Sequence, residues 1–159
     1  MKNIKNMKVY FASPWFTPEQ EEREDRVKNK LRSLGFNVWS PKDNCACSPI
    51  ADEETRKRVF NANVKNIMNC DIIFAITDGK DMGTIWEAGF ACGINKLKKF
   101  MNAEQIKIVY YCETLGPNGQ FNLMLAQSGD IVITEYEDLN KLPRLIEKDK
   151  GLTYNGIIE

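Results

Sequence analysis

Short apolar runs that alternate with longer amphipathic stretches are the feature of this chain that most constrains its fold. Residues 8–12, 71–76, 106–111 and 131–134 are rich in β-branched and aromatic side chains, and each run has the length of a buried strand. The stretches between them carry apolar residues at helical spacing. Strands that alternate with helices in this way predict a parallel sheet with helices on both faces.

The segment after the first run carries three signals for the start of a helix. Thr17 is a capping residue, Pro18 occupies the first helical position, and Gln20 follows the cap by three residues. An apolar stripe continues to residue 34, where Gly35 is expected to end the helix.

The remaining segments continue the same alternation. We expect a strand at 36–39, a polar loop at 40–52, and helices at about 53–69, around Glu87 as far as about 95, near 122–126 and at about 137–145, followed by a polar tail. The helix at 53–69 is expected to bury Val59, Phe60, Val64, Ile67 and Met68. The predicted architecture is a single α/β domain over residues 1–159, a flavodoxin-like three-layer sandwich with a five-stranded parallel or mostly parallel sheet.

Composition and charge argue against several classes of protein. The 22 basic residues balance the 22 acidic ones, so no net field favours nucleic acid or a membrane surface. No apolar stretch reaches the roughly 20 residues that span a bilayer. Residues 1–8 contain lysines without the apolar run of a signal peptide, so a cytoplasmic protein is expected. The five cysteines are an odd number and the chain has no histidine, which argues against a disulfide framework and a zinc site.

The stretch Asp81–Gly89 is the strongest candidate for a functional segment. It follows the run at 71–76, and ligands of open parallel sheets bind at the carboxyl ends of strands. In a chain without histidine, the roles of nucleophile and proton carrier fall largely to carboxylates such as Glu87. Two readings of Glu87 follow: a nucleophile on an electrophilic carbon, or an exposed carboxylate favoured near a helix N-terminus.

The loops after the first and third strands should meet at the switch point of the sheet. They bring together three aromatic and three acidic side chains, Tyr10, Trp15, Phe16, Asp78, Asp81 and Glu87. Aromatic rings can stack on a base, and carboxylates can accept hydrogen bonds from sugar hydroxyls. Residues 12–16 contain no glycine and one proline, so they lack the free N–H groups of a phosphate cradle. A sugar-and-base ligand without a phosphate is therefore expected.

Four blocks of the sequence resemble the nucleoside 2-deoxyribosyltransferases. In chain order they are residues 10–17, 41–44, 81–91 and 122–124, which read YFASPWFT, PKDN, DMGTIWEAGFA and NLM. The resemblance implies transfer of a 2-deoxyribosyl group between nucleobases, in which Glu87 attacks C1′ and forms a covalent ester. It implies deoxynucleosides and free bases as substrates, with neither a metal nor an organic cofactor, and no nucleic-acid or membrane partner.

The same resemblance assigns further residues. Tyr10 would position Glu87, and Asp81 would bind sugar hydroxyls. Asn122 would reach the sugar of a neighbouring subunit, and Met124 of the same block would also contact substrate. The protein would then be a homo-oligomer, built from dimers and commonly a hexamer in this family. Trp15 and Phe16 read either as core aromatics or as base-side contacts, and the base-side reading is favoured because two adjacent rings in a loop are hard to bury together.

Two base-side positions depart from the family pattern. Asn63 stands where the family often has an aspartate that assists the departing base, and Cys45 stands where it often has a glutamine. An amide cannot supply a proton as a carboxylic acid can. The change is consistent with altered base specificity, with slower transfer or with a shift toward hydrolysis.

Two other functions compete with this one. The first is hydrolysis of a 2′-deoxynucleoside or deoxynucleotide N-glycosidic bond by an enzyme of the same superfamily; the nucleotide form needs a phosphate-binding first loop. The second is a receiver-like signalling module, since Asp78 follows the third strand where such domains carry a phosphoacceptor. That module also needs an acidic pair after the first strand, where this chain has Ala12-Ser13-Pro14.

Overall fold

The computed structural model describes residues 3–159; Met1 and Lys2, which belong to the segment examined for a signal peptide, lie outside the described residues. At its centre is a five-stranded sheet with the order β2-β1-β3-β4-β6, in which every pair of neighbours is parallel. The strands are β1 (Lys8–Ala12), β2 (Asn37–Trp39), β3 (Ile72–Ile76), β4 (Lys107–Tyr111) and β6 (Ile131–Ile133). This is the flavodoxin-like order, so the predicted fold class is confirmed.

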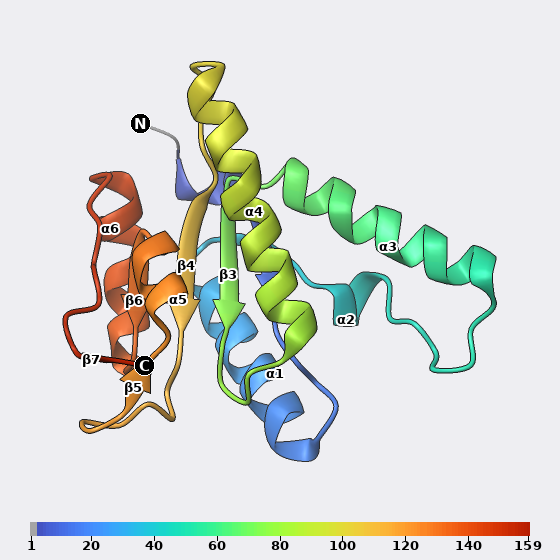
Figure 1. Cartoon of the computed structure of the whole chain (residues 1–159), viewed down its shortest axis with the longest axis horizontal. Coiled ribbons are helices and arrows are strands. Elements are labelled where there is room, and N and C mark those ends of the chain that lie inside the picture. The colour runs from blue at the N-terminus through green and yellow to red at the C-terminus, as the bar shows by residue number, and fades with distance from the viewer. Residues whose placement is uncertain (1–2) are drawn as a thin grey trace.

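Helices cover both faces of the sheet (Figure 1). Alternate strand residues point to opposite faces, and they form two separate cores. One core joins the sheet to α1 (Pro18–Ser33) and α6 (Leu142–Glu147). The other joins it to α3 (Glu53–Met68), α4 (Met82–Phe100) and α5 (Leu123–Ser128). Among residues 3–159, no helix is both long and apolar enough to cross a membrane.

The predicted helix-start signals after β1 are found at the N-terminus of α1. The Thr17 side chain accepts a hydrogen bond from the Gln20 amide, with Pro18 in the first turn. The Gln20 side chain accepts from the amide of Phe16 at 2.9 Å, so it fastens the preceding loop to the helix. Gly35 follows the helix with a φ of 97°, a left-handed conformation that glycine adopts without strain.

Several short elements differ from the prediction. The loop at 40–52 contains the short helix α2 (Pro41–Asn44), α4 continues to Phe100, and the last helix is preceded by the 3₁₀ helix η2 (Tyr136–Lys141). Another 3₁₀ turn, η1 (Ile4–Asn6), precedes β1. The tail is not only polar coil, because β7 (Ile157–Ile158) pairs with β5 (Gln120–Phe121) in a small parallel sheet.

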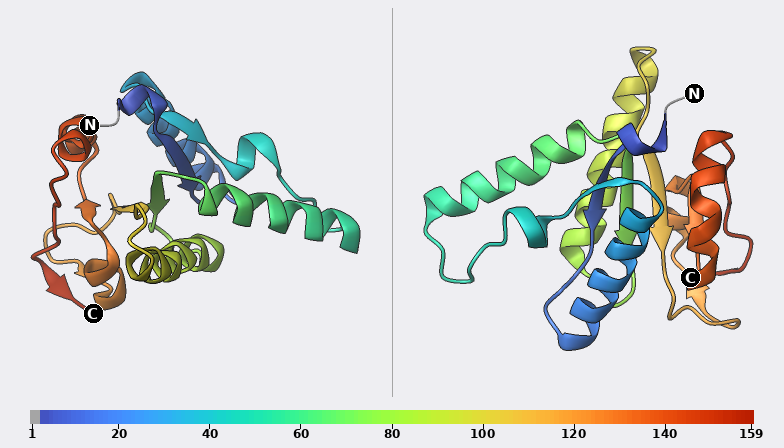
Figure 2. Two further views of the ribbon diagram at one scale, coloured as in Figure 1. Left: turned by 90° about the horizontal axis from the view of Figure 1, so that it is seen from above. Right: turned by 180° about the vertical axis from the view of Figure 1, so that it is seen from behind.

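The apolar side of α3 is less buried than the sequence indicates. Of the five side chains expected in the core, only Ile67 is buried; Phe60 and Met68 are 54% and 52% exposed. Figure 2 shows the reason, since the N-terminal half of α3 extends away from the sheet. Helical periodicity identifies an apolar face, but what covers that face depends on where the helix points.

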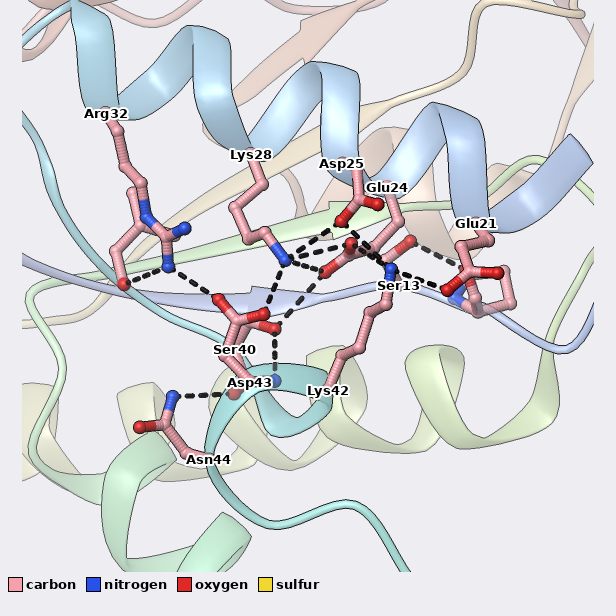
Figure 3. Close-up of polar contacts among 12 residues, drawn as sticks. Ser13, Glu21, Glu24, Asp25, Lys28, Arg32, Ser40, Lys42, Asp43 and Asn44 are labelled. Atoms are coloured by element: carbon pink, nitrogen blue, oxygen red, sulfur yellow. Dashed lines mark hydrogen bonds and ion pairs between the residues drawn. The ribbon is translucent and has the colours of Figure 1, made fainter. Parts of the chain in front are cut away.

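A dense network of ion pairs fastens α2 to α1 (Figure 3). The ammonium of Lys28, which is 3% exposed, lies 3.0 Å from Glu24 and 2.8 Å from Asp43. The ammonium of Lys42 lies 2.9 Å from Asp25. Burial raises the pKa of Glu24 even though Lys28 and Lys42 oppose the effect. Since several partners share each charge, the position of α2 relative to α1 is fixed.

Candidate active site

Tyr10 and Glu87 meet on the face of the sheet that α3, α4 and α5 cover. Tyr10 is fully buried in β1, and its hydroxyl donates a hydrogen bond to Glu87 Oε1 at 2.5 Å. Glu87 lies in the second turn of α4 and is partly buried. Neighbouring Ala88 and Ala91 are buried against the sheet, so their small size lets α4 pack closely. Over residues 3–159, no hydrogen bond engages the second carboxylate oxygen of Glu87.

The protonation of both groups is set by their surroundings. Burial raises the pKa of Glu87 to about 7, opposed by the hydrogen bond from Tyr10 and assisted by the carboxylate of Asp81. Burial and the nearby Glu87 raise the pKa of Tyr10 above its usual value, so the phenol stays protonated and acts as a donor. The pair therefore holds a carboxylate that ionises near neutral pH in a fixed orientation.

Asp81 is the N-cap of α4 and contributes a second carboxylate beside Glu87. Its Oδ2 accepts a hydrogen bond from the amide of Thr84 at 2.8 Å. One oxygen is thus engaged in capping the helix, and Oδ1 is left for another donor. Asp81 combines the local role expected of a cap with a location suited to binding a hydroxyl group.

Trp39 is a contributor to the site that sequence reasoning missed. Its ring stacks on that of Tyr10 with centroids 5.2 Å apart, because Trp39 in β2 and Tyr10 in β1 are register partners. The ring thus packs against the phenol from the neighbouring strand β2. The strand order and register, and not the spacing along the chain, bring Trp39 to this place.

The loop after β1 carries Trp15 and Phe16 at the same edge of the sheet. Their rings stack on each other at 5.4 Å, with Phe16 71% exposed and Trp15 partly buried. Pro14 is buried and offers no N–H group. The two rings therefore present an aromatic surface at the carboxyl ends of the strands, without the row of backbone donors that a phosphate needs.

Cys45 and Asn63 form a polar pair near Glu87. The Cys45 thiol donates to Asn63 Oδ1 at 3.0 Å and thereby joins the end of α2 to the middle of α3. Burial, and then the carboxylate of Glu87, raise the pKa of Cys45, which places the thiol within electrostatic reach of the candidate nucleophile. The structure thus brings together Tyr10, Glu87, Asp81, Cys45 and Asn63.

Comparison with known proteins identifies the family of the chain. The sequence model of the nucleoside 2-deoxyribosyltransferase family matches residues 9–132, most of the chain. The chain belongs to the nucleoside 2-deoxyribosyltransferase family. Membership makes it an enzyme of this superfamily. None of the curated protein sequences matches the chain significantly.

Solved structures share the fold of this deoxyribosyltransferase family member. A 2-deoxyribosyltransferase from the psychrotolerant bacterium Bacillus psychrosaccharolyticus is 26% identical with a TM-score of 0.74, and the match covers 92% of this chain and 98% of that one. A conserved protein from Enterococcus faecalis is 19% identical (TM-score 0.67, 88% and 98% covered). A CMP N-glycosidase from Clostridium botulinum is 17% identical (TM-score 0.52, 89% and 98% covered). The last two likenesses concern the fold alone.

Two residues that the deoxyribosyltransferase resemblance assigns to substrate lie elsewhere in the single chain. Asn122 caps α5, and its Oδ1 accepts from the amides of Met124 and Leu125. Asn122 and Met124 line a pocket of about 590 Å³ beneath α5, whose lining does not include Tyr10 or Glu87. Met124 is 74% exposed. In one chain these two residues are therefore separate from the Tyr10–Glu87 site.

Asp78 has a structural role in this deoxyribosyltransferase family member. Its buried carboxylate accepts hydrogen bonds from the amides of Glu113 and Thr114, at 3.2 and 2.8 Å. It thereby ties the end of β3 to the end of β4, and both oxygens are engaged. Asp78 is thus not free to act as a phosphoacceptor.

Within residues 3–159, no group of three or more histidine, cysteine, aspartate or glutamate side chains is arranged to hold a metal ion.

Proposed function

We propose that this protein transfers the 2-deoxyribosyl group from one nucleobase to another through an ester formed on Glu87. The observation that carries the proposal is the Tyr10–Glu87 hydrogen bond of 2.5 Å at a partly buried carboxylate, in a chain of the nucleoside 2-deoxyribosyltransferase family. Family membership supports the type of reaction, and the geometry supports Glu87 as the reacting group.

The proposed reaction has two balanced steps. In the first, the free Oε2 of Glu87 forms a bond to C1′ while the N-glycosidic bond breaks, and the base leaves with the electron pair and takes up a proton. In the second, a nitrogen of another base attacks C1′, releases a proton and returns the carboxylate. Two displacements at one carbon give net retention. Tyr10 holds Oε1 and so keeps Oε2 directed at the sugar.

The sugar is proposed to lie against Asp81, and the base against the aromatic and polar groups around it. Asp81 Oδ1 accepts from a sugar hydroxyl while Oδ2 keeps its bond to Thr84. Trp15 and Phe16 offer ring surface to the base. A 2-deoxy sugar forms the oxocarbenium-like transition state more easily than a ribose, and the Glu87 carboxylate stabilises that charge.

The experiment is to incubate the protein with 2′-deoxyinosine or thymidine plus adenine and to follow new nucleosides by chromatography, with and without adenine. We expect 2′-deoxyadenosine to form. Glu87→Gln should lose activity by about several orders of magnitude because the covalent step disappears. Glu147→Gln on α6 is the matched control and should keep wild-type exchange. Near wild-type exchange by Glu87→Gln would refute the assignment.

Hydrolysis is the second candidate function, and Asn63 is the observation that favours it. An amide gives a departing base less help than an acid, so a second base gains less from the site and water competes better for the ester. Free base and sugar without any exchange product would make hydrolysis the correct activity. Comparing a deoxynucleoside with its 5′-monophosphate tests the phosphate-free ligand inferred from Pro14.

We also propose that a second copy of the chain completes the site in a homo-oligomer built from dimers, of which a hexamer is the larger form. Asn122 and Met124 lie apart from Glu87 in one chain, and α3 and α4 expose Phe60 and Trp86, 54% and 50%, next to the site. Apolar surface that clusters in this way is typical of interfaces.

We place the enzyme in the cytoplasm, because all five cysteines are free thiols, as the reducing conditions of that compartment favour.

Subunit complementation tests this assembly. Glu87→Gln and Asn122→Ala should each be nearly inactive alone. Mixed after reversible dissociation, they should regain up to about a quarter of the wild-type activity, because random dimers contain one intact site in every four. A mixture that stays inactive, or a monomer by light scattering at assay concentration, would contradict the shared site.

A further inference from the structure

Cys45 occupies a position that is fixed from two sides. It closes α2, and its amide donates to the carbonyl of Pro41 at 2.8 Å. The ion pairs of Lys28 with Asp43 and of Lys42 with Asp25 attach α2 to α1 (Figure 3). The backbone that carries the thiol is therefore held by several ion pairs, one of them to the buried ammonium of Lys28.

The thiol determines which end of the Asn63 amide is available. Cys45 Sγ lies 3.0 Å from Asn63 Oδ1. Burial and Glu87 raise the pKa of the thiol, so it is protonated at neutral pH and donates this hydrogen bond. Oδ1 is thereby turned toward the thiol, so Nδ2 is the end of the amide presented on the other side. Over residues 3–159, Nδ2 of Asn63 makes no hydrogen bond to the protein.

The pair lies on the side of Glu87 that α3 faces. Phe60, one helical turn before Asn63, packs against Trp86 with ring centroids 5.8 Å apart, and Trp86 directly precedes Glu87. The thiol is electrostatically coupled to both Glu87 and Tyr10. A base released from a sugar on Glu87 thus has the Asn63 amino group within its surroundings, as a donor without an acceptor.

We propose that Asn63 selects purine bases that carry a carbonyl group at position 6, beside N7. Cys45 is the positioning residue that orients the side-chain amide of Asn63. This inference rests on the proposed function and names its substrate class. A 6-oxopurine presents two adjacent acceptors, O6 and N7, to the Nδ2 hydrogens of Asn63. A 6-aminopurine presents an amino group beside N7, which brings donor against donor. An amide held with Nδ2 toward the base therefore favours the oxo base.

The test compares kcat/KM for 2′-deoxyinosine and 2′-deoxyadenosine, measured as loss of the donor with one common acceptor base. We expect the ratio to favour 2′-deoxyinosine by about tenfold or more, since a buried polar group left against the wrong partner is costly. Asn63→Asp offers acceptors only when ionised, and should move the ratio toward 2′-deoxyadenosine by at least about tenfold.

Cys45→Ala separates positioning from contact. With the thiol gone the Asn63 amide can turn either end to the base, so the ratio should fall toward one without a matching loss of folded protein. In an Asn63→Ala background, Cys45→Ala should change the ratio no further. Cys47→Ala is the matched control, since Cys47 is an exposed thiol two residues away and its loss should leave the ratio unchanged.

The outcomes distinguish this inference from the proposed function. Equal kcat/KM values for the two donors, or a Cys45→Ala ratio equal to that of wild type, would overturn the inference and leave the transfer reaction standing. If neither donor is consumed, the proposed function fails. Calorimetric titration of the wild-type protein with hypoxanthine and with adenine then tests the selection directly, and equal Kd values for the two bases overturn it.

Discussion

Replacing Tyr10 with phenylalanine removes one hydroxyl from the centre of the proposed site and should change the pH at which the enzyme becomes active. The Tyr10 hydroxyl donates to Glu87 Oε1 at 2.5 Å and lowers the pKa of Glu87 against the effect of burial. Glu87 must be ionised to attack carbon, so activity should rise with pH through its pKa of about 7. Without the hydroxyl, that pKa should rise further.

The size of the shift follows from the hydrogen bond. A hydrogen bond to a charged group contributes about 1.5–3 kcal/mol, and about 1.36 kcal/mol corresponds to one pKa unit. The protonated carboxyl also accepts a hydrogen bond and keeps part of that energy, so we expect a shift of about one unit. The ionised fraction of Glu87 at pH 7 would then fall from about one half to about one tenth.

The assay is the pH dependence of kcat/KM, which reports groups of the free enzyme. Tyr10→Phe should move the acidic limb about one unit higher and recover much of its activity near pH 9. Tyr110→Phe is the matched control, because it removes another buried tyrosine hydroxyl, one that is paired with Ser128. An acidic limb that stays in place in Tyr10→Phe, or that moves to lower pH, would refute the reasoning.

The remaining predictions concern other charged groups. Asp81→Asn keeps a helix cap but removes the charge that raises the Glu87 pKa, so its acidic limb in kcat/KM should move to lower pH, opposite to Tyr10→Phe. The pKa of Glu87 rises on folding from 4.5 to about 7, so wild-type stability should fall as pH rises through that window. Glu87→Gln should abolish this and be more stable by up to about 3 kcal/mol at pH 8 in urea unfolding, with little gain at pH 4; equal pH dependence would contradict it. Lys28→Met should cost about 3 kcal/mol by leaving Glu24 short of its nearest partner, and Lys28→Met with Glu24→Leu should recover most of it.

Sequence patterns located the fold because the strands of the central sheet and the long helices carry local signals. The apolar run of β3 and the cap, proline and glutamine at the start of α1 depend only on neighbours along the chain. The short helix α2 was missed although Ser40 and Pro41 are an N-cap and a first-turn proline, since four residues have no helical periodicity to detect. The pairing of β7 with β5 depends on contacts between distant segments, which no local pattern contains.

The site was predictable to a similar degree. The resemblance pointed to Tyr10 and Glu87, and parallel topology explains why a residue in β1 meets one in α4. The hydrogen bond between Cys45 and Asn63 could not be foreseen, because it depends on the direction in which α3 leaves the loop after α2. The exposure of Phe60 was missed for the same reason.

The aromatic rings around Glu87 also make the protein its own spectroscopic probe. The chain has three tryptophans: Trp15 follows β1, Trp39 stacks on Tyr10, and Trp86 directly precedes Glu87. All of its indole fluorescence therefore originates from this neighbourhood. A base stacked on Trp15 should quench part of the emission, whereas a partner chain that covers half-exposed Trp86 should shift emission to shorter wavelengths. Ligand titration and dilution of the unlabelled protein can thus be followed separately in one cuvette.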